Sequence, residues 1–383
     1  MNVACFVVGL LVTLVTIANV LFTMVLPRRP MGIERLSLEV NRAVRLVFLG
    51  LSRLVKSYEA KDAVLAPTAT VALVAQLLSW AGGLVLGFGL MLVATTHSFG
   101  SALLQALTAE FTVGAVHVGG AANLGIDITI GAIWVVIVAL QIAYLPTLYG
   151  AFNRRESLVS LLESRAGVPA WGPELLARHQ MVGIADTLPD LYAKWEEWSA
   201  DVAESHTTYP VLLLFRSPEP WYSWVLGVLA VLDAAAMHYA LDPDAASSQA
   251  RLCLRMGFTL FNRIAATLGW PVDLDPNPEG PIDLTYEEFE AAVATLAELG
   301  FPMTRSAAEA WPHFRGWRVN YESVAYRIAD RVTAPPAPWS GTRRHLRVET
   351  VGPRRPPQRE PGSQTKLDFQ RPPVTSTGRR RRR

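Results

Sequence analysis

The chain has 383 residues, of which 51% are hydrophobic and only 18% are charged. Soluble domains contain about 25% charged residues, so this composition excludes a wholly water-soluble protein. The two cysteines, Cys5 and Cys253, exclude a disulfide framework and a cysteine-based zinc site. Charge is unevenly distributed: residues 154–334 hold 14 Lys/Arg and 24 Asp/Glu, whereas residues 335–383 hold 13 and 3.

The first segment, residues 1–26, contains no charged residue and predicts an N-terminal transmembrane helix. About 20 apolar residues are enough to cross a bilayer core of about 30 Å. A cleaved signal peptide is the alternative, but no Lys or Arg precedes the apolar run, which is also longer than a signal h-region. Arg28 and Arg29 follow at once. The positive-inside rule therefore places the N-terminus outside and the C-terminal end of this helix in the cytoplasm.

Residues 27–66 are basic, with 8 Lys/Arg against 4 Asp/Glu. Apolar residues recur at helical spacing from Ile33 to Val55, and four arginines lie among the other positions. This pattern predicts a cytoplasmic amphipathic helix on or near the membrane. A connector packed on a soluble domain is an equally good interpretation.

Residues 67–153 contain no Lys or Arg, and two apolar spans fit at roughly 67–95 and 126–150. Arg154 and Arg155 then mark a return to the cytoplasm. These spans predict a multi-pass plasma-membrane protein whose C-terminus is cytoplasmic. In the first of them, Gly83 and Gly87 form a small-xxx-small pair, which predicts a close helix-packing face.

The segment between these spans is apolar although it lies on the outer side. Residues 99–111 read FGSALLQALTAEF, a short helix that cannot cross the bilayer, and a Gly-rich stretch follows. Irregular backbone at membrane depth is tolerated only where protein buries it or where it lines a wet cavity. The segment therefore predicts a re-entrant pore loop.

These residues resemble a known family. Residues 102–118, ALLQALTAEFTVGAVHV, are similar to the pore helix and selectivity filter of two-transmembrane-type potassium channels. Residues 142–156, IAYLPTLYGAFNRRE, and 207–217, TTYPVLLLFRS, resemble bacterial ion-channel proteins of actinobacterial type, which continue into a cytoplasmic helical domain. The resemblance implies an all-α membrane protein with a pore module of outer helix, pore loop and inner helix. It also implies a homotetramer that conducts monovalent cations.

The resemblance places the selectivity filter at Thr112, Val113, Gly114, Ala115 and Val116. In the family, the backbone carbonyls of Thr-Val-Gly-Tyr-Gly replace the hydration shell of the ion. Ala115 stands at the place of the tyrosine, and Val116 at the place of the second glycine, whose backbone conformation a β-branched residue reaches only at a cost. We therefore expect any conduction to discriminate potassium from sodium poorly.

Two ionisable residues flank this filter. His117 stands where the family has an aspartate at the outer mouth. As a simple loop residue it would be solvated, but in four copies around a pore its protonation near pH 6.5 would oppose cation passage. Glu110, the nearest acidic residue, is expected behind the filter, in a hydrogen-bonded pocket or at a polar subunit seam.

Residues 154–334 predict one mostly helical cytoplasmic domain. Residues 223–241 are apolar for nearly their whole length, but Asp233 and His238 interrupt them, so we expect a buried core helix with a satisfied Asp–His pair and not a fourth span. A fourth span would also export the basic tail. No HExxH, GxSxG or P-loop pattern occurs, so the sequence predicts no catalytic residue, cofactor or metal site and no enzyme.

Residues 335–383 hold 9 of the 26 prolines and end in five consecutive arginines. This composition predicts a disordered tail. Anionic cytoplasmic lipid is a suitable partner, at about 1 kcal/mol per basic residue near the surface, and the acidic domain is another. Nucleic acid is not an expected partner, because no aromatic interleaving accompanies the charge. The alternative function is a non-conducting scaffold or sensor derived from a channel; a membrane enzyme is a more distant third.

Overall fold

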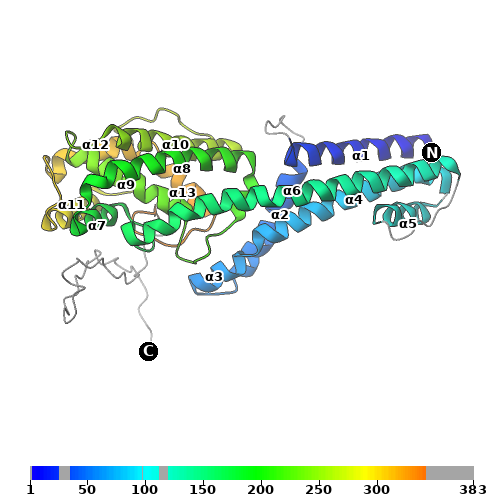
Figure 1. Cartoon of the computed structure of the whole chain (residues 1–383), viewed down its shortest axis with the longest axis horizontal. Helices are drawn as coiled ribbons and strands as arrows, with labels where there is room; N and C mark the ends of the chain where they lie inside the picture. The colour runs from blue at the N-terminus through cyan, green and yellow to red at the C-terminus, as the bar shows by residue number, and fades with distance from the viewer. Residues whose placement is uncertain (1, 26–34, 97, 112–119, 342–383) are drawn as a thin grey trace. The chain divides into compact units, whose positions relative to one another are not determined.

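The computed structural model describes residues 2–25, 35–96, 98–111 and 120–341 (Figure 1). Within these ranges the regular structure is entirely helical, with no β-strand, as the sequence predicts. The chain divides into two compact units, Met1–Gly150 and Ala151–Arg383. We call them the first unit and the second unit.

In the described part of the chain, the first unit contains helices at the three predicted spans together with three other helices. They are α1 (Asn2–Met24), α2 (Arg35–Ser52), α3 (Tyr58–Leu65), α4 (Thr68–Thr96), α5 (Phe99–Glu110) and the first part of α6 (Ala121–Ala166). By length and composition, α1, α4, α6 and one helix of the second unit are able to cross a membrane. These apolar helices fit a multi-pass membrane protein.

Small residues bring α1 and α4 together. A Cβ atom added at Gly83 would lie 2.6 Å from Thr16 Oγ1, so the two backbones approach too closely for a side chain there. Gly87 faces Thr13 and Gly9 in the same way, one turn further along the two helices. The predicted packing face at Gly83 and Gly87 is confirmed, and its partner is α1.

A buried polar cluster joins three helices of the first unit. The Asn19 side-chain carbonyl on α1 accepts hydrogen bonds from Trp80 Nε1 on α4 and from Ser37 Oγ on α2, each 2.8 Å long. Thr23 Oγ1 lies 2.9 Å from the same Ser37 hydroxyl. Polar groups among apolar helices need such partners, because leaving one unpaired is costly. The cluster therefore fixes the rotation of α1 relative to its neighbours.

The amphipathic helix predicted within residues 27–66 is found as α2, and a second, shorter helix, α3, follows it in this part of the chain. Helix α2 ends at Ser52, and α3 begins after Ser57, whose Oγ accepts a hydrogen bond from the Ala60 amide. Such capping stabilises a new helix start. Helix α2 packs against α4 and belongs to the first unit, with Leu46 and Val47 exposed.

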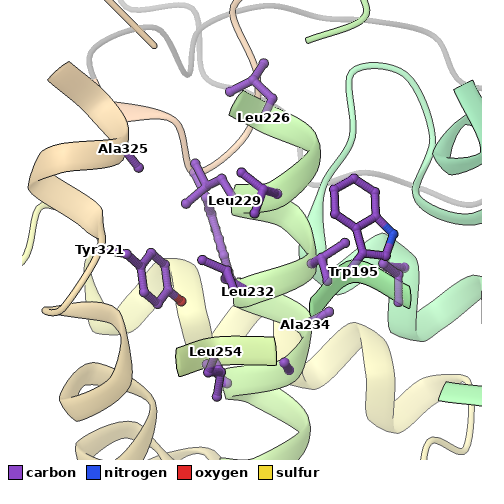
Figure 2. Packing of buried hydrophobic residues seen from close by; sticks show 14 of the residues in the cluster. Trp195, Leu226, Leu229, Leu232, Ala234, Leu254, Tyr321 and Ala325 are labelled. Carbon is purple, nitrogen blue, oxygen red and sulfur yellow. The ribbon is translucent and has the colours of Figure 1, made fainter. Parts of the chain in front are cut away.

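The second unit is a bundle around one central helix. Its helices are α7 (Gly172–Val182), α8 (Leu188–Thr208), α9 (Trp224–Leu241), α10 (Ser248–Thr267), α11 (Tyr286–Glu298), α12 (Ala307–Arg318) and α13 (Glu322–Arg331), with short 3-10 turns η1 (Ala185–Thr187) and η2 (Pro210–Leu214). Figure 2 shows Tyr321 and Ala325 on one side of α9 and Trp195 on another. Ninety-four per cent of α9 is buried. Residues 223–241 thus form a core helix, as predicted.

The polar residues of α9 are satisfied, but not by each other. Asp233 accepts a 2.8 Å hydrogen bond from the Tyr321 hydroxyl and forms a 2.5 Å ion pair with Arg318. His238 lies beside Tyr192, whose hydroxyl is 3.4 Å from the ring Nδ1. The predicted Asp–His pair is therefore wrong. Two side chains that are five residues apart on a helix point to different faces, and here each one contacts a partner on another element.

Helix α6 is longer than the span predicted at 126–150. It begins at Ala121, passes through Pro146 without interruption and ends at Ala166. Its C-terminal part contributes Val159, Leu162 and Ala166 to the core of the second unit. One continuous helix therefore belongs to both units.

Candidate pore-loop site

Helix α5 is the central element of the predicted pore loop. Its 12 residues correspond to about 18 Å, much less than a bilayer core of about 30 Å. One face, formed by Ala102, Ala106 and Ala109, is buried in a cluster with Leu84, Phe88 and Leu92 of α4 and with Ile130 and Ile137 of α6. Alanine side chains are small, so they let α5 lie close to α4 although each of them contributes little apolar area.

A polar contact connects α5 to the start of α6. The Gln105 amide nitrogen donates to both carboxylate oxygens of Asp127, at 3.1 and 2.8 Å, and both side chains are buried. Asp127 is the acidic residue within the apolar part of α6, and charge at such a place requires a partner. This pair was not predicted from the sequence, which shows only that Asp127 and Gln105 are polar residues inside otherwise apolar segments.

Glu110, predicted behind the filter, is the last residue of α5 and is completely buried. Neither carboxylate oxygen has a hydrogen-bond partner within the part of the chain that the structure describes. A carboxylate at a helix C-terminus also meets the negative end of the helix dipole. Burying an ionised carboxylate without a partner is strongly unfavourable.

The filter residues Thr112, Val113, Gly114, Ala115 and Val116, and His117 at the predicted outer mouth, lie outside the described residues. The structure does describe the residues that precede this segment. The Phe111 ring packs against the Trp134 ring on α6 in an edge-on arrangement, with 5.5 Å between ring centroids. A Cβ atom added at Gly131 would lie 3.3 Å from the Ala109 carbonyl oxygen, so α6 passes close to the end of α5.

Helix α6 presents an apolar face that the first unit leaves uncovered. Only 17% of its most apolar stretch is buried. Exposed residues recur every seven positions: Ile128, Val135, Ile142 and Tyr149. A seven-residue apolar repeat keeps one face of a helix toward a partner helix. This face is therefore available to lipid or to other copies of the chain.

Two adjacent arginines where α6 enters the second unit have different roles. Arg154 is exposed and forms a 3.1 Å ion pair with Asp201. Arg155 is completely buried: it donates to the backbone oxygens of Leu212 and Phe215, at 3.0 and 2.9 Å, and pairs with Glu156. In the sequence, both arginines serve only as markers of membrane topology. Arg155 in fact ties α6 to the turn η2 inside the second unit.

Among the residues that the structure describes, no group of three or more His, Cys, Asp or Glu side chains is placed to hold a metal ion. No protein-family model, no curated protein and no solved structure matches this chain.

Proposed function

We propose that this protein is a subunit of a homotetrameric membrane pore of the pore-loop type, which conducts monovalent cations with little preference for potassium. One observation supports the proposal most strongly. A helix too short to cross a membrane lies between two helices long enough to do so, packs against them, and ends where the Thr-Val-Gly sequence begins. In this arrangement α4 is the outer helix, α5 the pore helix and α6 the inner, pore-lining helix.

The uncovered face of α6 supports the oligomer. A re-entrant backbone needs several copies around it, because no water is present at membrane depth to satisfy its polar groups. The repeat from Ile128 to Tyr149 gives each α6 a face for its neighbours. The burial of Glu110 also agrees with an oligomer, since its carboxyl group would face the filter or the contact between two subunits. We expect a tetramer by mass photometry in lipid nanodiscs; a monomer would contradict the proposal.

The charge pattern supports a defined orientation in the plasma membrane. The N-terminus of α1 lies outside in this proposal, α2 and α3 lie at the cytoplasmic surface, and the second unit lies in the cytoplasm. The basic tail would then meet anionic lipid on the cytoplasmic leaflet, where such clusters are attracted most strongly.

Conduction is tested directly by recording from purified protein in planar bilayers under a potassium–sodium gradient. The unaltered protein should carry current with a reversal potential close to that of an unselective cation pore. The combined change Ala115→Tyr, Val116→Gly and His117→Asp should move the reversal potential toward the potassium equilibrium value. The three changes are made together, because the aromatic brace and the glycine conformation act as a unit.

A second function has its own support. The replacements at Ala115, Val116 and His117 favour a non-conducting protein of channel type, in which the second unit acts as a scaffold or sensor. The bilayer recordings separate the two functions. If neither the unaltered protein nor the triple variant carries current while both assemble as tetramers, the pore proposal is wrong and the scaffold or sensor function is preferred.

A further inference from the structure

A hollow of about 380 Å³ opens in the second unit, between the C-terminal end of α6 and helix α8. Its apolar lining consists mainly of Leu158, Leu161, Leu162, Leu191 and Trp195. Small-molecule sites in proteins have volumes of about 300–1,000 Å³ and are lined mostly by apolar side chains with a few polar groups. The size and the lining of this hollow agree with such a site.

Three charged residues also line the hollow: Arg165 on α6, and Asp190 and Lys194 on α8. The lining therefore carries two positive charges and one negative charge. Within the described residues, no ion pair involves the Arg165 guanidinium. Arg165 is partly buried, and the fully buried Arg318 of the same unit is by contrast paired with Asp233.

The partner of Arg165 is a neutral histidine. Arg165 Nη1 lies 3.1 Å from His179 Nε2, and His179 Nδ1 lies 2.7 Å from the Leu175 carbonyl oxygen. A carbonyl only accepts hydrogen bonds, so Nδ1 holds the ring proton and Nε2 accepts from the guanidinium. Burial lowers the pKa of His179, which keeps the ring neutral at pH 7. His179 thus holds Arg165 in place and leaves its positive charge uncompensated.

We propose that this hollow binds a small amphiphilic monoanion, with its apolar body against the leucines and Trp195 and its acidic group between Arg165 and Lys194. The net charge of the lining, one positive, suits a single negative charge. A guanidinium that is already oriented binds a carboxylate at a low entropic cost, because its planar donors match the two carboxylate oxygens. The apolar lining gives such a ligand an advantage over a small inorganic anion, because it removes apolar surface from water. The proposal does not depend on ion conduction.

Equilibrium dialysis with radiolabelled octanoate tests the proposal on the full chain in phosphatidylcholine nanodiscs at pH 7.5. Empty nanodiscs give the amount that partitions into lipid. The neutral analogue 1-octanol and the cation octylammonium have the same apolar chain without the negative charge. We expect saturable binding of one octanoate per chain, and binding of either analogue at least tenfold weaker. Absence of saturable octanoate binding, or equal binding of octanol, would overturn the proposal.

Matched variants locate the site. Arg165→Gln and Lys194→Gln should each weaken octanoate binding about tenfold, whereas Arg263→Gln, an exposed arginine on α10 outside the hollow, should leave it unchanged. Lys194 is exposed, so its replacement does not threaten folding. Leu161→Trp should also weaken binding, because it fills the hollow without changing its charge. Unaltered affinity in the Arg165→Gln, Lys194→Gln double variant would overturn the assignment.

Discussion

Two helices of this protein are similar in sequence character and opposite in environment. Helices α6 and α9 are both long and apolar enough to cross a membrane. Yet 94% of α9 is buried in its own unit, against only 17% of the most apolar stretch of α6. Composition alone does not distinguish a core helix from a membrane span. The difference lies in whether the rest of the chain supplies enough apolar surface to cover the helix.

The interiors of the two units also differ in the size of the side chains that pack there. Between α1 and α4, small residues such as Gly9 and Gly87 let the backbones meet. Around α9, large side chains and buried ion pairs fill the core. In lipid, helices gain little from burying apolar area against one another, so close approach and hydrogen bonds must hold them. In water, burial of large apolar side chains is the main source of stability.

The largest effect is expected from breaking the ionic cluster in the second unit. Arg318 is completely buried and pairs with Asp233 and Glu322. Arg318→Ala would leave both carboxylates buried without their cation, which costs about 3–5 kcal/mol of unfolding free energy. Tryptophan fluorescence during urea unfolding measures this, since nine of the eleven tryptophans lie in residues 151–341.

The matched control for this prediction is Arg263→Ala, because Arg263 is an exposed arginine of the same unit. It should change the unfolding free energy by less than about 0.5 kcal/mol. Similar small losses for both variants would show that the cluster around Asp233 does not stabilise the core.

The next effect concerns the packing of α1 on α4. A side chain at Gly87 would collide with Thr13, whereas one at Gly82 meets nothing within 4 Å. Gly87→Val should therefore destabilise the first unit by about 1–3 kcal/mol through overpacking, and Gly82→Val should not. The SDS mole fraction at half-unfolding, followed by circular dichroism, measures the change. If Gly82→Val is as damaging as Gly87→Val, the close α1–α4 contact is not what holds these helices together.

A smaller, pH-dependent effect is expected in the second unit. Burial, followed by the charge of Arg155, holds the pKa of His206 well below its usual value. In the unfolded chain, His206 binds a proton near pH 6.5, whereas in the folded chain it stays neutral at that pH. The free energy of unfolding therefore falls as the pH drops below about 6.5. The loss is at most about 1.4 kcal/mol per pH unit for one such histidine.

Urea unfolding at pH 7.5, 6.0 and 5.0 measures this dependence. His206→Asn should reduce the loss of stability on acidification. It should not abolish it, because burial also lowers the pKa of His179. An unchanged pH dependence in His206→Asn would mean that His206 is not a source of the acid sensitivity.

The smallest effect is expected at the polar cluster of the first unit. Asn19→Leu removes the acceptor for Trp80 Nε1 and for Ser37 Oγ. Hydrogen bonds between membrane helices contribute only about 0.6 kcal/mol on average. The SDS midpoint should therefore fall less than in Gly87→Val. A fall larger than that of Gly87→Val would reverse the ranking of close packing over hydrogen bonding in this unit.

Much of the helical framework could be predicted from the sequence, because charge and apolar periodicity are local properties. The predicted spans at 67–95 and 126–150 fall on α4 and α6, and residues 99–111 fall on α5. The end of α6 could not be predicted. Arg154 and Arg155 read as a polar boundary, but an arginine inside a protein core needs partners distant in sequence, and Arg155 finds them at Leu212 and Phe215.

The candidate site was predicted only in part. Glu110 is buried at the end of α5, and its place behind a filter stays a prediction, because the predicted filter lies outside the described residues. The link between Gln105 and Asp127 was not predicted, because a pairing across two helices depends on how they rotate against each other. The hollow beside Arg165 was also missed. Its defining property, an arginine bonded to a neutral histidine, has no signature in local sequence.

The proposed topology has one central feature: we propose that α4 crosses the membrane whereas α9 lies in a water-soluble core. Single cysteines in an otherwise cysteine-free full chain test it, at Lys56 and Ser98 on either side of α4 and at Glu219 and Asp244 on either side of α9, all exposed positions. An impermeant maleimide applied to intact cells should label the Ser98→Cys variant and none of the other three. After lysis, the cysteines of all four variants should react. Labelling of Asp244 but not Glu219 in intact cells would contradict the account, because α9 would then be a membrane span.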